Sequence, residues 1–159
     1  TAFLIADRVD LVDQEKHDIL EAGYLAEIGK TIVPENILYR NGGLTEDDFT
    51  HIHMHPREGV RKLRNAGYEN ERMLELIECH HENYDGSGYP AGIREENIPL
   101  GARILAVAEA YISLTSKRPY RDPWDGHAAL NELGKYVRSG KFDPAIVDEL
   151  GHIVAELPS

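Results

Sequence analysis

Two adjacent histidines, His80 and His81, stand where a helical pattern ends and a loop of unusual composition begins. Met73, Ile77 and His80 lie at helical spacing, so the pair flanks an apolar helix face. Residues 82–90, ENYDGSGYP, contain glycines and a proline that forbid a continued helix and predict a shaped loop. Imidazoles beside such a loop could provide nitrogen ligands for a metal next to a substrate pocket. A helix end with partly buried, hydrogen-bonded histidines would give the same pattern, so on the pair alone both interpretations stay open.

The surrounding residues resemble the carboxy-terminal half of the HD-GYP domains, a subset of the HD phosphohydrolases that open cyclic di-GMP. Residues 80–93 read HHENYDGSGYPAGI and residues 98–121 read IPLGARILAVAEAYISLTSKRPYR, in the order and spacing of that family. The resemblance implies an all-α helical bundle of the HD-domain type. It also implies a site for divalent metal among histidines and acids, where iron, manganese, nickel or zinc suits the ligands and lowers the pKa of a water.

The resemblance places metal ligands at three histidines of this chain. One is His55 in an HP-x-x-G motif, and the others are His80 and His81. Two more histidines, His51 and His53, lie near the first of these. A histidine-rich, exposed helix turn explains them more economically than a role in metal binding.

The acidic motifs of the family are altered in this sequence. Where the family has His-Asp-x-Gly-Lys, the chain has Ala26 and Glu27, with Lys30 retained. Alanine offers no lone pair, whereas glutamate can still bind a metal from one methylene further out. The metal-binding aspartate of a later helix becomes Glu109, and a second aspartate there becomes Ile112. Glu27 could instead form an i, i+3 ion pair with Lys30, and Glu109 a salt bridge with an arginine; these alternatives stay open.

The residues that the resemblance assigns to the substrate are better preserved. Tyr89, which follows Gly88, could stack on a nucleotide or donate a hydrogen bond to it. Arg118 and Arg121 resemble the phosphate-binding pair of the family, since guanidinium groups match phosphate oxygens, and Lys30 could also reach a phosphate. On composition alone, surface salt bridges would explain both arginines.

Composition narrows the class of protein. The 159 residues suffice for one domain with a sizeable core, and we expect residues 1–159 to form it. Because the chain begins at Thr1 and a further family histidine would precede it, we expect an N-terminally truncated fragment of a longer signalling protein. The net charge of −11 disfavours nonspecific nucleic-acid binding. The single cysteine, Cys79, predicts a reducing, cytoplasmic location, and the absence of a run of ~18 apolar residues predicts no membrane segment.

Helices must position these residues, and sustained strand-like alternation is absent. We expect Thr45 and Asn70 to cap helices, and Gly29 to stop the one that carries Glu27. The periodicity predicts helices over residues 3–9, 14–28, 126–139 and 144–157, a long one through residues 49–63 bent at Pro56, one ending at His80, and one from Pro99 through Tyr111. Asn41-Gly42-Gly43 predicts a loop, and residues 116–126 an irregular segment.

Two functions follow from this pattern. The changes at Ala26, Glu27, Glu109 and Ile112 fall in the metal site, while the loop and the arginines are spared. We therefore expect a catalytically impaired domain that binds a nucleotide or a protein. The alternative is an active, metal-dependent cyclic di-GMP phosphodiesterase. The partners that the resemblance implies are cyclic di-GMP or a related cyclic dinucleotide, and a diguanylate cyclase (GGDEF) domain.

Overall fold

The computed structural model describes residues 1–40, 42–118 and 121–156, which form helices joined by loops and confirm the all-α fold. Of the residues named above, Asn41, Pro119, Tyr120 and Leu157 lie outside the described part. The α-helices are α1 (Ala2–Arg8), α2 (Asp13–Leu25), α3 (Glu35–Leu38), α4 (Glu46–His53), α5 (His55–Asn65), α6 (Glu71–Cys79), α7 (Leu100–Thr115), α8 (Gly126–Arg138) and α9 (Pro144–Glu156). The 3-10 helices are η1 (Ala26–Ile32) and η2 (Glu95–Asn97).

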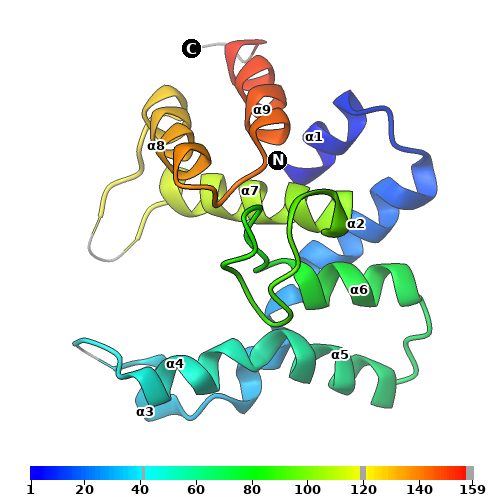
Figure 1. Ribbon diagram of the computed structural model, residues 1–159, viewed down its shortest axis with the longest axis vertical. Helices are drawn as coiled ribbons and strands as arrows, with labels where there is room; N and C mark the ends of the chain where they lie inside the picture. The colour runs from blue at the N-terminus through cyan, green and yellow to red at the C-terminus, as the bar shows by residue number, and fades with distance from the viewer. Residues whose placement is uncertain (41, 119–120, 157–159) are drawn as a thin grey trace.

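Helix α7 is the centre of the bundle. It packs against α1, α2, α6, α8 and α9 (Figure 1). Its sequence is apolar on most of its circumference, and Ile104, Val107 and Ala108 are almost fully buried. A helix with so wide an apolar surface is stable only when neighbours cover it on several sides. Helices α4 and α5 lie at one end of the molecule and reach α7 through α6 (Figure 1).

The predicted helix over residues 14–28 is wrong in its last turn. The α-helix ends at Leu25, and the chain continues as the 3-10 helix η1, in which Gly29 packs directly on the first turn of α5. A Cβ atom on Gly29 would lie 1.8 Å from the backbone oxygen of His55. Side chains three residues apart eclipse one another in a 3-10 helix. The tighter winding therefore brings Glu27 and Lys30 to the same side of η1.

The long helix predicted through residues 49–63 is interrupted beside Pro56, as expected. Helix α4 ends at His53 and α5 begins at His55, with the proline in its first turn. Proline has no N–H and cannot bond to the carbonyl four residues earlier, which belongs to Ile52. That carbonyl lies 2.7 Å from Nδ1 of His55 instead. The proline thus leaves an acceptor that orients a predicted metal ligand.

Two predicted helix caps are confirmed. Thr45 accepts a hydrogen bond from the backbone of Asp48, whose carboxylate accepts one from the backbone of Thr45. Asn70 accepts from the backbone of Met73 and donates to the buried carboxylate of Asp18 on α2, so one residue both caps α6 and joins it to α2. Across the residues that the structure describes, every helix is too short or too polar to cross a membrane.

Candidate metal centre and cavity

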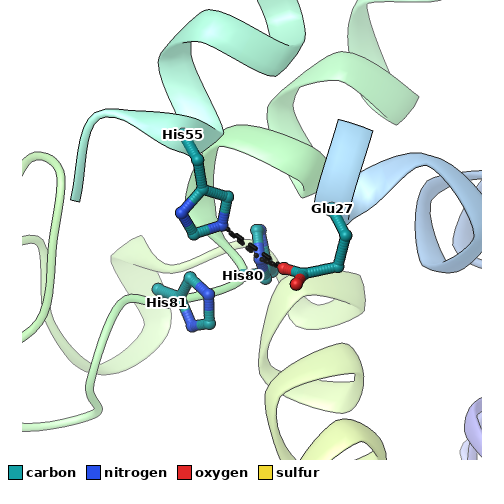
Figure 2. Close-up of side chains that lie close together, drawn as sticks. All are labelled: Glu27, His55, His80 and His81. Carbon is teal, nitrogen blue, oxygen red and sulfur yellow. Dashed lines mark hydrogen bonds and ion pairs between the residues drawn. The ribbon is translucent and has the colours of Figure 1, made fainter. Parts of the chain in front are cut away.

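Four side chains converge at the ends of three helical elements. Glu27 comes from η1, His55 from the start of α5, and His80 and His81 from the end of α6 (Figure 2). Their ligand atoms all lie within 4.8 Å of one another. We call these residues the ligand group. Of the predicted histidine pair, His80 is 1% exposed and His81 is half-buried, so a buried helix end and a metal-binding role are compatible with each other.

The spacing within the ligand group suits one metal ion. Oε1 of Glu27 lies 3.4 Å from Nε2 of His55 and 3.6 Å from Nε2 of His80, and the two nitrogens lie 3.5 Å apart. For bonds of about 2.1 Å, tetrahedral coordination places neighbouring donor atoms about 3.4 Å apart. Three imidazoles and one carboxylate are also a donor set that zinc, iron, manganese and nickel accept. The residues present therefore fit a single divalent ion.

Backbone carbonyls fix two of the imidazoles. Nδ1 of His55 lies 2.7 Å from the oxygen of Ile52, and Nδ1 of His80 lies 2.6 Å from the oxygen of Ile77. A carbonyl oxygen only accepts, so each Nδ1 must carry the proton and donate it. The Nε2 atoms then present their lone pairs to the ligand group, which is the arrangement that orients histidine ligands in metal sites.

Electrostatics favour the metal-binding form of two members of the group. Burial, followed by the neighbouring rings of His80 and His55, lowers the pKa of His81 to about 2, so this imidazole is neutral at neutral pH. Burial alone would raise the pKa of Glu27, but the neighbouring side chains of His55, His80 and Lys30 outweigh it and hold that pKa well below its usual range. A neutral imidazole and an ionised carboxylate are the forms that bind a cation.

The two carboxylate oxygens of Glu27 face different partners. Oε2 forms the predicted ion pair with Lys30, while Oε1 faces His55 and His80. The two alternatives raised for Glu27, an ion pair and a metal ligand, are therefore compatible. Lys30 neutralises one oxygen and leaves the other available to a metal.

Glu109, the other predicted acidic ligand, lies outside the ligand group. Its side chain on α7 is exposed and lines the cavity beside the group. Because the carboxylate is not buried, it needs neither a metal nor an arginine to offset the free-energy cost of burying a charge. Leu105, Glu109 and Ile112 share one face of α7: all three line a second, smaller cavity of about 300 Å³ that Glu27 and His80 also line.

A cavity of about 610 Å³ opens next to the ligand group, and we call it the main cavity. It brings together four of the five residues that the family resemblance relates to the substrate. Its lining includes His80 and His81 together with Gly88, Tyr89, Arg118 and Arg121. Among the described residues that line it, Lys30 is not found, since its ammonium is bound to Glu27.

The segment of residues 82–92, which we call the GYP loop, is held in one shape. A Cβ atom on Gly88 would lie 2.2 Å from the backbone nitrogen of Asn83, so no larger residue fits there. The buried carboxylate of Glu82 accepts hydrogen bonds of 2.7 and 3.1 Å from the backbone of Ala91 and Gly92. These contacts fix the loop and place the ring of Tyr89 in the wall of the cavity.

His53 is a site residue that the sequence did not indicate. Its ring stacks on that of Tyr89, with centroids 3.9 Å apart and planes at 18°, and it lines the main cavity. Tyr89 also contacts the ligand group, because the centroids of its ring and that of His81 lie 4.9 Å apart. His53 is exposed, as predicted. The sequence could not show the stack, because Tyr89 lies in a distant segment of the chain.

The two arginines are bound to the end of α7. Arg118 donates to the hydroxyl of Ser113 at 2.8 Å, and Arg121 donates to the carbonyl of the same residue at 2.6 Å. The guanidinium of Arg121 also lies 5.4 Å from the ring centroid of Trp124. Within the described part of the chain these contacts, rather than surface salt bridges, set the positions of both side chains.

Comparisons with known proteins agree with this geometry. The model of the HD domain family matches residues 1–146. The chain is 42% identical over 151 residues to the cyclic di-GMP phosphodiesterase response regulator RpfG of Xanthomonas campestris, covering 94% of this chain and 39% of that protein. It is 32% identical over 148 residues to 3'3'-cGAMP-specific phosphodiesterase 2 of Vibrio cholerae, covering 92% of this chain and 28% of that protein.

A solved structure shares the fold. Bd1817, an HDG"Y"P protein of Bdellovibrio bacteriovorus, superposes with a TM-score of 0.74 at 21% identity, over 97% of this chain and 49% of that one. The chain thus spans less than half the length of each protein compared here. The family match over residues 1–146, together with the relative of 42% identity, shows that this chain belongs to the HD domain family, in its HD-GYP group.

Proposed function

We propose that this domain hydrolyses a phosphodiester bond of a cyclic dinucleotide such as cyclic di-GMP, in a metal-dependent reaction. The observation that carries the proposal is the convergence of Glu27, His55, His80 and His81 at donor spacings suited to one ion, beside a cavity lined by arginines. The printed names of the relatives, which act on cyclic di-GMP or on 3'3'-cGAMP, support this class of substrate.

Each group of residues has its own role in the proposed reaction. The ligand group would hold a divalent ion, which when bound would supply a water of lowered pKa and neutralise phosphate charge. Arg118 and Arg121, already oriented by α7, offer their remaining N–H groups to phosphate oxygens. Burial and then the carboxylates of Glu109 and Glu27 raise the pKa of Tyr89, so its hydroxyl stays protonated and can donate a hydrogen bond. Its ring offers a stacking face to a base.

A second candidate, binding without hydrolysis, is favoured by Ala26. This residue is 7% exposed and places a methyl group where the family has a histidine ligand. The single ligand group among the described residues accounts for one ion, whereas two-metal hydrolysis needs a pair about 3.5–4 Å apart. A diguanylate cyclase domain as protein partner stays a prediction from the family resemblance.

Turnover of defined substrates separates the two candidates. The purified domain is incubated anaerobically with manganese or ferrous iron and either cyclic di-GMP or 3'3'-cGAMP, and linear and mononucleotide products are separated by chromatography. We expect hydrolysis that His80→Ala abolishes. His51→Ala is the matched control, because His51 is exposed and outside the ligand group.

Binding without turnover would refute the enzymatic proposal and support the second candidate. In that case the double variant Ala26→His, Glu27→Asp should raise metal binding above that of either single change, since a bridging acid and its neighbouring histidine act as a unit. Hydrolysis by the unmodified domain at a rate that these changes do not raise would instead remove the second candidate.

A further inference from the structure

The turn between α8 and α9 contributes to the lining of the main cavity. Tyr136 at the end of α8 and Lys141 and Phe142 in the turn line the cavity together with His81 and Tyr89. In the sequence, residues 140–143 only separate the predicted helices over residues 126–139 and 144–157. Because Lys141 and Phe142 line the same cavity as the arginines, they can contact a ligand that binds in this cavity.

The turn is fixed to the GYP loop by its backbone. The backbone N–H of Tyr84 donates to the oxygen of Lys141 at 3.0 Å, and that of Asp85 donates to the oxygen of Gly140 at 2.9 Å. Gly140 has a φ of +82°, and a Cβ atom there would lie 2.9 Å from that of Asp85, so only glycine permits this approach. The turn and the GYP loop therefore form one rigid wall.

A buried ion pair secures the far end of the turn. Asp143 and Arg103 of α7 lie 2.6 Å apart, with side chains 5% and 14% exposed. The same carboxylate accepts from the backbone of Ala145 at the start of α9. Lys141 is thus held between two anchored positions, the loop contact on one side and this ion pair on the other.

The ammonium group of Lys141 is available to a ligand. It lies 5.2 Å from the ring centroid of Tyr136 and 5.4 Å from that of Phe142, and within the described residues no carboxylate pairs with it. Arg121 differs, because one of its nitrogens is taken by the carbonyl of Ser113. Lys135 on the same helix also differs, because it pairs with Glu132.

Charge explains why such a cation matters. The chain carries a net charge of −11, so a ligand with two phosphates is repelled by the protein as a whole. Cations within the cavity must offset that repulsion locally. Two of its described lining residues, Arg118 and Arg121, are cations bound to the end of α7, and Lys141 adds a third from the turn before α9.

We propose that Lys141 is a further phosphate-binding residue of the main cavity, contacting the phosphate of a cyclic dinucleotide that is not held at the ligand group. The inference rests on the proposed class of ligand. It makes Lys141 a residue that favours ligands with two phosphates over a mononucleotide. Tyr136 and Phe142 hold the ammonium in place through cation–π contacts.

Calorimetry with cyclic di-GMP tests the proposal, without added divalent metal so that the metal-dependent hydrolysis does not interfere. We expect Lys141→Met to weaken affinity about tenfold, the lower end for a hydrogen bond to a charged group because this side chain is exposed. Lys141→Arg should restore most of the affinity, which a merely structural role would not require. Affinity for guanosine 5'-monophosphate should change less than twofold. Lys135→Met is the matched control and should leave both affinities unchanged.

The outcomes are separable. If the unmodified domain binds no cyclic di-GMP, the proposed class of ligand fails and this inference fails with it. If the domain binds and Lys141→Met binds equally well, Lys141 is not a phosphate contact and the proposed function stands. If Lys141→Arg is as weak as Lys141→Met, the positive charge is not what the ligand recognises, and the inference is wrong.

Discussion

Replacing Gly29 with alanine should disrupt the ligand group from a distance. The new Cβ atom would lie 1.8 Å from the backbone oxygen of His55, whereas real Cβ contacts under 3.0 Å are essentially never seen. Helices η1 and α5 would have to separate by about 1.2 Å, the difference between those two values. That movement would carry Glu27 away from His55, whose donor atoms now lie 3.4 Å apart.

The expected size of the effect follows from this displacement. Overpacking costs about 1–3 kcal/mol, and a clash with rigid backbone belongs at the upper end. Misplacing a group that orients metal ligands typically lowers affinity about 10- to 100-fold, and we expect a loss in this range for zinc. Urea unfolding measures the first quantity, and competition with a chromophoric chelator measures the second.

Two other glycines provide a graded comparison. A Cβ atom on Gly59, across the same interface, would meet its nearest neighbours at 3.3 Å, so Gly59→Ala should have a smaller effect of the same kind. Gly151 in α9 has nothing within 4 Å of the added atom, and Gly151→Ala should be neutral or stabilising. The reasoning is refuted if Gly29→Ala binds zinc and resists urea as the unmodified domain does.

Three further changes test other contacts. His53→Ala should weaken cyclic di-GMP binding about 3- to 10-fold, because a stacked aromatic pair contributes about 0.5–1.5 kcal/mol; His53→Phe should not, and calorimetry compares them. Arg103→Met should destabilise the domain by about 3–5 kcal/mol in urea, since it leaves the buried carboxylate of Asp143 without its cation; an effect under about 1 kcal/mol would contradict this. Hydrogen bonds from the backbone and hydroxyl of Thr45, and then the charge of Arg40, lower the pKa of Asp48. Its stabilising contribution is therefore present above the unfolded pKa of about 3.9 and is lost as the pH falls through the lower folded value. The difference in the free energy of unfolding between the unmodified domain and Asp48→Asn should be constant near neutral pH and become smaller below about pH 4. A difference that grows below pH 4 would contradict this prediction.

Local features were predictable from the sequence, because they depend on neighbouring residues. Thr45 and Asn70 cap helices as their side chains and positions predict. The interruption at Pro56 follows from a missing N–H. The histidine pair at the end of α6 lies with His55 and Glu27 in a group whose spacing could hold a metal, and its metal-binding role stays a prediction from the family resemblance.

Features that depend on distant segments were not predictable. Nothing around Gly29 shows that α5 passes close enough to require a 3-10 helix, so the helix over residues 14–28 was extended too far. The stack of His53 on Tyr89 joins α4 to the GYP loop, and Lys141 reaches the cavity from the turn before α9. Periodicity reports which face of a helix is apolar but not which segment covers it.

The number of metal ions bound per chain tests the central claim most directly. The domain is purified with iron, manganese or zinc and analysed by elemental analysis, together with His55→Ala and the control His51→Ala. The account predicts one ion per chain, lost in His55→Ala and kept in His51→Ala, because the ligand group has room and donors for one ion. Two ions per chain, or none, would contradict it.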